Sequence, residues 1–359
     1  MKEYRIITIP GDGIGPELME STIAVLEAVQ EMNGALKLNL EEHEAGAGRY
    51  ARYGKRISDE TLQACHEADG ILKAPVGNPA VRTPEGTEAG LLGGVLRTGL
   101  DLFANMRPVK LYPGIRSPLA GYEPGGIDYV VIRENTEGLY ASRDKGVGGP
   151  EAVADTLIIT RKGTERVVRF AFELSRKRNG APEDGVRRVT CVDKSNVLRS
   201  MALFREVFFE VAADYPDIEA EAVYSDACAN HLVIRPAHYD VLVMENMLGD
   251  LLSDLGGATA GGLGMCPSGN IGEKFAFFEA VHGSAPDIAG QGIANPLSLI
   301  LSAALMLAHI GESEAANQIE TSVWGALEAG EIRLDNKGRA VDGSQAITEA
   351  VCARVRGEI

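Results

Sequence analysis

Two aspartates, Asp250 and Asp254, are four residues apart in the run NMLGDLLSDLGG, whose apolar pattern is typical of a helix. At this spacing both carboxylates lie on one helix face. Two like charges on a mostly apolar face repel each other, and carboxylate oxygens are preferred ligands of hard divalent cations. We therefore interpret Asp250 and Asp254 as ligands for Mg²⁺ or Mn²⁺. The alternative is a helix whose acids simply face solvent.

Three arginines, Arg97, Arg107 and Arg133, lie earlier in the chain, in LRTGLDLFANMRP and VIRENTEGLY. A guanidinium group grips a carboxylate with two parallel hydrogen bonds, so three of them together could hold a dicarboxylate or a tricarboxylate. If the three do not converge, they are scattered surface arginines of little energetic consequence.

A glycine-rich turn, GDGIGPE, spans Gly11 to Glu17. It lacks the third glycine of the GxGxxG fingerprint, so an ordinary Rossmann pyrophosphate loop is not expected. The turn could bring its backbone close to a ligand, or it could be a tight turn capped by Pro16 at a helix start.

The elements that would position these residues alternate along the chain. The strand-like runs YRIITIP, LKLNLEEHE, DGILKAP, DYVVIREN, RRVTCVD, AEAVYSD and DVLVMEN are separated by helical patterns. This alternation is typical of an α/β sheet, whose ligand crevice lies at the carboxyl ends of the strands. The segment SRDKGVGGPEAVADTLIITRKG interrupts the alternation, and we interpret it as a flexible loop or as an arm that pairs with a second subunit.

The composition narrows the class of partner. The chain has 359 residues and a net charge of -16, which argues against nucleic acid and anionic membranes as partners. The five cysteines are scattered and lack CxxC spacing, so neither a disulfide framework nor a zinc site is expected. The longest apolar segment, from Leu297, is too short to span a bilayer. We expect a cytoplasmic protein.

Six motifs together resemble one enzyme family. GDGIGPE, LRTGLDLFANMRP, RENTEGLY, DKSNVL, NMLGDLLSD and HGSAPDIAGQGIANP occur in the order seen in the isocitrate and isopropylmalate dehydrogenases. The resemblance extends along essentially the whole chain. It implies a metal-dependent β-decarboxylating dehydrogenase that oxidises a (2R)-malate with a substituent at C3 and uses a nicotinamide cofactor.

The resemblance also implies roles for individual residues. The three arginines would hold the malate carboxylates. Asp250 and Asp254 would bind the metal together with Asp226 of the partner subunit. Lys194, also from the partner, would take part in removing the proton of the C2 hydroxyl, and Tyr140 would donate a proton to C3.

A discontinuous architecture is implied as well. Residues 1–99 and 259–359 would form a cofactor-side domain, and residues 100–258 would form a substrate, metal and dimerisation domain. The segment 141–162 would be an intersubunit arm. Active sites shared between two subunits would make a homodimer necessary for activity.

The choice of cofactor depends on Asp287 in HGSAPDIAG. By resemblance, its carboxylate would accept hydrogen bonds from the adenosine ribose and repel a 2′-phosphate, which favours NAD over NADP. Members of the family that use NADP carry basic or tyrosyl residues in place of Asp287 and Ile288. The other residues expected at the cofactor are Ile14, Asn196, His282, Gly283 and Asn295.

The residues before Arg97 bear on the C3 substituent of the substrate. The stretch before Arg97 resembles the E-x-G-L-L of isopropylmalate dehydrogenases if Gly93 and Gly94 are an insertion, and Leu91 and Leu92 would then face an isopropyl group. The alternative is that both leucines pack into the core. RENTEGLY, with Asn135, is closer to the isocitrate, homoisocitrate and tartrate enzymes. We take 3-isopropylmalate as the leading substrate, with isocitrate, homoisocitrate, tartrate or D-malate, and a noncatalytic paralogue, as alternatives.

Overall fold

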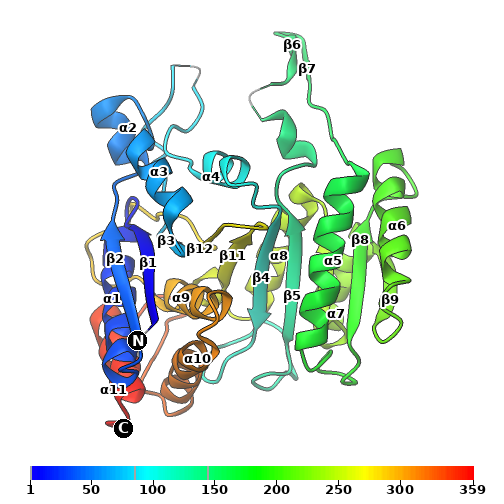
Figure 1. The fold of residues 1–359 in the computed structure, drawn as a ribbon. Coiled ribbons are helices and arrows are strands. Elements are labelled where there is room, and N and C mark those ends of the chain that lie inside the picture. Colours follow the sequence, from blue (N-terminus) through cyan, green and yellow to red (C-terminus); the bar gives the residue numbers. More distant parts are fainter. Residues whose placement is uncertain (1, 85, 144) are drawn as a thin grey trace.

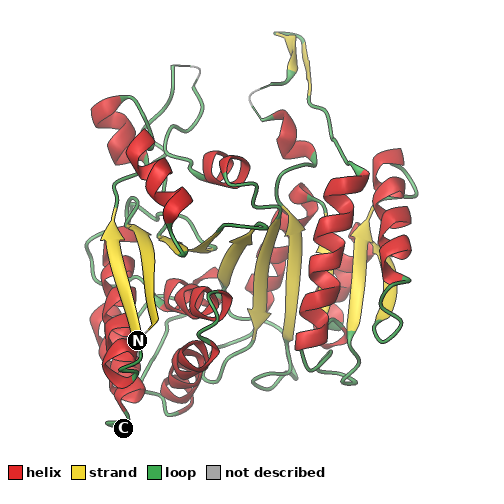
Figure 2. Cartoon of the chain, in the orientation of Figure 1, coloured by secondary structure: helices red, strands yellow, loops and turns green. Residues whose placement is uncertain are grey.

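A computed structural model describes residues 2–84, 86–143 and 145–359. In this part of the chain one ten-stranded sheet runs through the molecule in the order β2-β1-β3-β12-β11-β4-β5-β10-β8-β9 (Figure 1). Helices lie on both of its faces (Figure 2). The protein therefore has the mixed α/β architecture that the alternating runs predict.

The strands and helices have the following bounds. The strands are β1 (Lys2–Ile9), β2 (Leu36–Glu42), β3 (Gly70–Lys73), β4 (Ala104–Lys110), β5 (Asp128–Glu134), β6 (Val147–Gly149), β7 (Ala152–Ala154), β8 (Arg188–Asp193), β9 (Glu219–Tyr224), β10 (Val241–Met244), β11 (Pro267–Ile271) and β12 (Ala276–Ala280). The α-helices are α1 (Gly15–Met32), α2 (Ala47–Tyr53), α3 (Asp59–Glu67), α4 (Gly93–Gly99), α5 (Arg161–Lys177), α6 (Arg199–Ala212), α7 (Ser225–Ile234), α8 (Asn246–Thr259), α9 (Leu297–His309), α10 (Ser313–Glu328) and α11 (Ser344–Arg356). Short 3₁₀ turns are η1 (Leu139–Ser142), η2 (Pro236–His238) and η3 (Leu263–Met265).

The sheet changes character at its centre. β1, β2, β3 and β12 are parallel, and so are β5, β10, β8 and β9. Between these two groups, β11 and β4 form antiparallel pairs with each other and with their outer neighbours. All strands up to residue 73 and after residue 266 lie on one side of the β11–β4 junction, and β4, β5, β8, β9 and β10 lie on the other. The division into two domains at residues 99 and 259 stays a prediction.

All seven predicted runs form strands of this sheet. β5, β8 and β10 are almost wholly buried, as strands covered on both faces should be. The long apolar segment from Leu297 forms α9, most of whose side chains are buried between its neighbours. Within the described residues, no helix is long and apolar enough to cross a membrane. All five cysteines are buried and free.

The glycine-rich segment forms a small hairpin of β6 and β7 that stands away from the sheet (Figure 1). Val147 and Val153 on this hairpin are 79% and 69% exposed. The run LIIT forms no regular strand and contributes an isolated bridge between Ile158 and Gly138. The assignment of residues 141–162 as an intersubunit arm stays a prediction, and Asp144 within it lies outside the described residues.

Candidate active site

Two of the predicted arginines come from the central strands. On β4, Asn105 and Arg107 are two residues apart, so their side chains point to the same face. Arg133 on β5 lies directly opposite Asn105 in the antiparallel pair. Arg107 donates a hydrogen bond to Asn105 at 2.7 Å, and both guanidinium groups are buried, with Arg133 only 2% exposed. The strand register therefore brings two cations together inside the protein.

Helix α8 carries the two predicted metal ligands against these strands. Gly249 allows the close approach, because a Cβ atom at this position would lie 2.6 Å from the Cβ of Arg133. The Glu245 side chain caps the helix by accepting hydrogen bonds from the backbone of Met247 and Leu248. Asp250 and Asp254 then share one helix face, as predicted, and both lie beside Arg107, at 3.5 Å and 3.2 Å.

The third predicted arginine reaches the cluster from α4. The Nε atom of Arg97 donates to Asn270 at 2.9 Å, and its Nη2 donates to Glu279 at 3.2 Å. Glu279 also lies 2.7 Å from the ammonium group of Lys73, which is nearly inaccessible to solvent. Asn270 accepts further hydrogen bonds from Asn105 and Asn135. A continuous buried polar network thus fixes Arg97 next to the two strand arginines.

The electrostatics of this cluster favour an anionic ligand. Burial, together with the like charges of Arg97 and Arg107, lowers the pKa of Arg133 to about 9. Burial also lowers the pKa of Arg107. The pKa of Asp250 is lowered because its burial is outweighed by Arg133 and Arg107. The guanidinium groups therefore repel one another, and additional carboxylates would relieve that repulsion.

Tyr140 lies at the edge of the arginine cluster. Its hydroxyl donates a hydrogen bond to Asp250 at 3.1 Å, and the guanidinium of Arg133 lies 5.6 Å from the centroid of its ring. Burial, followed by the negative charge of Asp250, raises the pKa of Tyr140, so the phenol keeps its proton at neutral pH. A protonated phenol of this kind can donate a proton to a reacting atom.

Lys194 and Asp226 form a separate pair. The ammonium group of Lys194 lies 2.6 Å from the carboxylate of Asp226 at the start of α7, and this hydrogen bond lowers the pKa of Asp226. The Asp226 side chain is largely exposed. Among the residues that the structure describes, no group of three acidic, histidine or cysteine side chains could hold a metal ion. Asp226 therefore does not join Asp250 and Asp254 within one chain.

A cavity of about 470 Å³ collects most of the predicted cofactor residues. Its lining includes Ile14, His282, Gly283, Ile288 and Asn295, and also the residues from Gly261 to Gly264. The Nε2 atom of His282 is buried without a hydrogen-bond partner in the described structure, and burial lowers the pKa of this ring. Asp287 and Asn196 are exposed and do not line the cavity, whereas Lys337 and Arg339 do.

Comparison with known proteins identifies the family. A family model described as "Isocitrate/isopropylmalate dehydrogenase" matches residues 5–352. The chain belongs to the isocitrate/isopropylmalate dehydrogenase family. It is 42% identical to a 3-isopropylmalate/3-methylmalate dehydrogenase of Methanocaldococcus jannaschii, across 99% of this chain and 100% of that protein. It is 40% identical to a 3-isopropylmalate dehydrogenase of Aquifex aeolicus, across 98% and 97% of the two chains.

Solved structures agree with this family assignment. The crystal structure of isocitrate dehydrogenase from Methylococcus capsulatus is similar to this chain with a TM-score of 0.86 and 37% sequence identity, over 98% of this chain and 99% of that one. The family predicted from the six motifs is thus confirmed, and membership supports an oxidoreductase of the decarboxylating dehydrogenase type.

The residues expected near the C3 substituent of a family substrate have different surroundings. Leu92 is fully buried and packs in the core with Leu96 and Leu100, whereas Leu91 is 42% exposed. Asn135 is buried, and its side-chain oxygen has no hydrogen-bond partner in the described structure. Only Leu91 of the two leucines has a side chain available to a ligand in this conformation.

The glycines of the first turn serve contacts within the protein in this family member. Gly11 and Gly13 have positive φ angles of 71° and 60°, and Cβ atoms there would lie 2.1 Å from the carbonyl oxygen of Pro75 and 2.0 Å from that of Ser284. The Asp12 side chain between them accepts a hydrogen bond from the backbone amide of Gly77 at 2.8 Å. The turn therefore holds two other loops in place while Ile14 lines the cofactor-side cavity.

Several residues of the site carry no obvious signal in the sequence. They are Lys73, Asn105, Asn246, Ser253, Asn270 and Glu279, which bind the arginines or one another. Of these, Asn105 could have been found, because it is two residues from Arg107 in an extended run.

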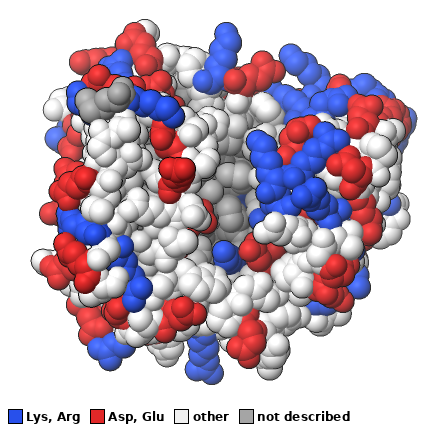
Figure 3. Space-filling view, turned by 60° about the horizontal axis from the view of Figure 1, so that its bottom comes forward, with Lys and Arg blue, Asp and Glu red and all other residues white. Residues whose placement is uncertain are grey.

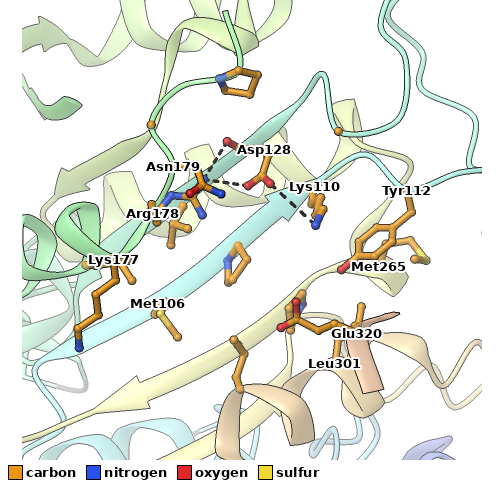
Figure 4. A pocket seen from close by; sticks show the side chains of 18 residues that line it. Met106, Lys110, Tyr112, Asp128, Lys177, Arg178, Asn179, Met265, Leu301 and Glu320 are labelled. Atoms are coloured by element: carbon orange, nitrogen blue, oxygen red, sulfur yellow. Dashed lines mark hydrogen bonds and ion pairs between the residues drawn. The ribbon is translucent and has the colours of Figure 1, made fainter. Parts of the chain in front are cut away.

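A second cavity of about 450 Å³ lies on the face of β4 and β5 opposite to the one that carries the arginines (Figure 4). Arg178 and Lys110 point toward Asp128 on one wall, at 2.8 Å and 4.0 Å, and Glu320 lies on the opposite wall. None of the residues predicted for the active site of this protein lines this cavity.

On the outer surface shown in Figure 3, acidic and basic side chains are interspersed around a central hollow.

Proposed function

We propose that this protein catalyses the NAD-dependent oxidative decarboxylation of a 3-substituted (2R)-malate, with 3-isopropylmalate as the leading substrate. The observation that carries the proposal is the convergence of Arg97, Arg107 and Arg133 beside Asp250 and Tyr140. The names of relatives near 40% identity, 3-isopropylmalate dehydrogenases, support the choice of substrate. Asn135 and the likeness to an isocitrate dehydrogenase keep isocitrate as the second candidate.

The arginines would bind the two malate carboxylates. Because Arg133 is buried beside Arg97 and Arg107, and its pKa is lowered to about 9, the added negative charge of a bound dicarboxylate would favour its charged form. The substrate would thereby be fixed with C2 and C3 near Tyr140. This fixed orientation contributes to catalysis because reacting groups no longer have to find each other.

Asp250 and Asp254 fit a hard divalent cation. They supply carboxylate oxygens on one helix face, and Asp254 is about half exposed. Asp226 would have to come from the partner subunit, since it does not reach the other two within one chain. When bound, Mg²⁺ or Mn²⁺ supplies Lewis-acid polarisation of the substrate oxygens, and the nicotinamide supplies the hydride acceptor.

The proton transfers would be carried out by two side chains. Lys194 of the partner subunit would take part in removing the proton of the C2 hydroxyl as C2 is oxidised. Tyr140, whose raised pKa keeps its proton in place, would deliver a proton to C3 after carbon dioxide has left. Asp250 accepts the Tyr140 hydrogen bond and so orients the phenol.

The cofactor-side cavity suits an adenosine group. Its apolar walls include Ile14 and Ile288, and the unpartnered Nε2 atom of His282 offers a hydrogen bond to a purine. Because burial lowers the pKa of His282, the ring is neutral at pH 7, and since its Nδ1 donates to the carbonyl of Gly283, its Nε2 can accept a hydrogen bond. Asp287 at the adjacent surface would disfavour a 2′-phosphate, which is the basis for proposing NAD.

The domain and subunit arrangement forms part of the same proposal. Residues 1–99 and 259–359 would form the cofactor-side domain, and residues 100–258 the substrate, metal and dimerisation domain. The exposed hairpin of β6 and β7 would be the arm between subunits of a homodimer.

Turnover assays test the proposed function. We would follow NAD reduction with Mn²⁺ or Mg²⁺ and compare 3-isopropylmalate, isocitrate, homoisocitrate, D-malate and tartrate at equal concentration. Preference for 3-isopropylmalate is the expected result. Preference for another of the five would assign the substrate differently, and the absence of turnover with all five would contradict the proposed function.

A further inference from the structure

An arginine that the motifs do not single out lies where the C3 substituent is expected. A Cβ atom on Gly94 would lie 2.8 Å from the Nη1 atom of Arg143, so this guanidinium sits over the start of α4. A Cβ atom on Gly93 would lie 3.6 Å from the Cζ atom of Arg97. Gly94 thus leaves room for the tip of Arg143, whereas a side chain at Gly93 would make an ordinary contact with Arg97.

Arg143 is also close to the predicted proton donor. Its guanidinium carbon lies 5.7 Å from the centroid of the Tyr140 ring, and its backbone amide donates to the carbonyl of Tyr140 at 3.2 Å. The preceding residue, Ser142, is anchored by hydrogen bonds with the backbone of Thr156, at 2.6 Å and 2.9 Å. The base of the Arg143 side chain is therefore held in place while its guanidinium group is exposed.

The family resemblance places the C3 substituent near this guanidinium in two ways. Tyr140 would deliver its proton to C3, and the stretch from Gly90 to Gly94 would face the group attached to C3. The guanidinium group of Arg143 lies near the Tyr140 ring and over Gly94. In the described part of the chain, no carboxylate lies within ion-pair distance of it, although many other arginines have such a partner. Leu91, on the same stretch, offers an apolar side chain instead.

We propose that Arg143 is a specificity residue that binds a carboxylate carried by the C3 substituent. This inference rests on the proposed function. The subsite would then have a cationic wall at Arg143 and an aliphatic wall at Leu91, so the enzyme would accept tricarboxylates such as isocitrate alongside malates with a branched alkyl group. Arginine suits this role because its planar fork matches a carboxylate.

The test compares substrates in wild-type enzyme and in Arg143→Met, which keeps an unbranched side chain without the charge. We expect the ratio of kcat/KM for isocitrate to that for 3-isopropylmalate to fall about tenfold or more, as for the loss of a charged hydrogen bond in a specificity pocket. An unchanged ratio would overturn the inference. If the wild type oxidises no malate at all, the proposed function has failed instead, so the two failures are distinguishable.

Two further variants sharpen the result. Gly94→Ala would push the flexible tip of Arg143 aside without removing its charge, and it should lower the same ratio. Arg116→Met serves as the matched control, because Arg116 is an exposed arginine in the loop between β4 and β5, at the other end of these strands from Ala104 and Glu134. It should leave both kcat/KM values unchanged.

Binding provides a readout that does not depend on turnover. Tricarballylate, an unreactive tricarboxylate, should inhibit the wild type more strongly than succinate, which lacks the third carboxylate. In Arg143→Met this advantage should largely disappear. Equal advantage in both proteins would show that another group reads the third carboxylate and would overturn the inference.

Discussion

The ammonium group of Lys73 lies 2.7 Å from the carboxylate of Glu279, and Arg97 lies 3.2 Å from the same carboxylate. β3 and β12 pair in parallel and place Lys73 directly beside Glu279. The ion pair between Lys73 and Glu279 joins two adjacent strands. Glu279 in turn binds Arg97, which is predicted to hold the substrate. Lys73 and Glu279 thus hold Arg97 in place without a role of their own in the proposed chemistry.

Replacing Glu279 by Gln should destabilise the fold at neutral pH. Burial opposes the charge of Glu279, but Lys73 and Arg97 outweigh it and lower its pKa from 4.5 to about 2. Since the folded-state pKa lies below the unfolded one, this stabilisation is complete above about pH 4.5 and is lost as the pH falls toward 2. We expect Glu279→Gln to lower the free energy of unfolding by about 3 kcal/mol at pH 7, as for other broken buried pairs.

The measurement is denaturant unfolding at fixed protein concentration, repeated between pH 7 and pH 3. The stability of Glu279→Gln should decline less than that of the wild type over the acid range. Glu328→Gln, at an exposed position on α10, is the control and should behave as wild type. Parallel pH curves for wild type and Glu279→Gln would contradict the assignment of the charge to Glu279.

The sequence predicts the outer parts of the sheet better than its centre. The buried strands β5, β8 and β10 are recognisable because they are runs of apolar β-branched residues. β4 and β11 are not, since ANMRPVK and PSGNI contain proline and buried polar side chains. These polar residues belong to the network around the arginines, so two strands that carry the site have an obscured pattern, whereas β5, which carries Arg133, does not.

The contacts of the site likewise divide into those that a local sequence pattern predicts and those that it does not. The relation of Asp250 to Asp254 is local, and helical spacing alone predicts that they share a face. The contact of Asn105 with Asn270 joins residues separated by 165 positions and depends on a strand pairing that no local pattern specifies. Arg143 is hidden in a glycine-rich stretch that resembles a loop, and only its proximity to Gly94 in space suggests a role.

Replacing Tyr140 by Phe should impair catalysis more than substrate binding. The variant loses the hydroxyl that donates to Asp250 at 3.1 Å but keeps the ring against Arg133. We expect kcat to fall by about 10²- to 10⁴-fold, the usual range for a lost general acid, with KM within a few-fold of wild type. Steady-state kinetics with the preferred substrate measures this. A large rise in KM with unchanged kcat would assign Tyr140 to binding instead.

The preference for NAD should depend on charges around the adenosine-side cavity. Replacing Asp287 by Lys removes a negative charge that would repel a 2′-phosphate, and Lys337 and Arg339 already line the cavity. We expect the ratio of NADP to NAD affinity to rise about tenfold or more in Asp287→Lys, and to fall in Lys337→Met. Equilibrium binding of NADPH and NADH by fluorescence measures both ratios without turnover. Identical ratios in Asp287→Lys and wild type would exclude Asp287 as the discriminating residue.

Mixed dimers test whether the active sites are shared between subunits. Lys194 pairs with Asp226, and Tyr140 pairs with Asp250, and no hydrogen bond or ion pair connects the two pairs among the described residues. If Lys194 serves the partner's site, a hybrid of a Lys194→Met chain and a Tyr140→Phe chain contains one site with both native residues. Each parent homodimer contains none. Refolding the two variants together should therefore recover about a quarter of wild-type activity, since about half of the dimers are hybrids with one intact site each.

Two chains carrying the same substitution, mixed in the same way, are the control and should recover nothing. Failure of the hybrid to exceed its parents, with hybrid formation verified by differently tagged chains, would place Lys194 and Tyr140 in the same subunit's site.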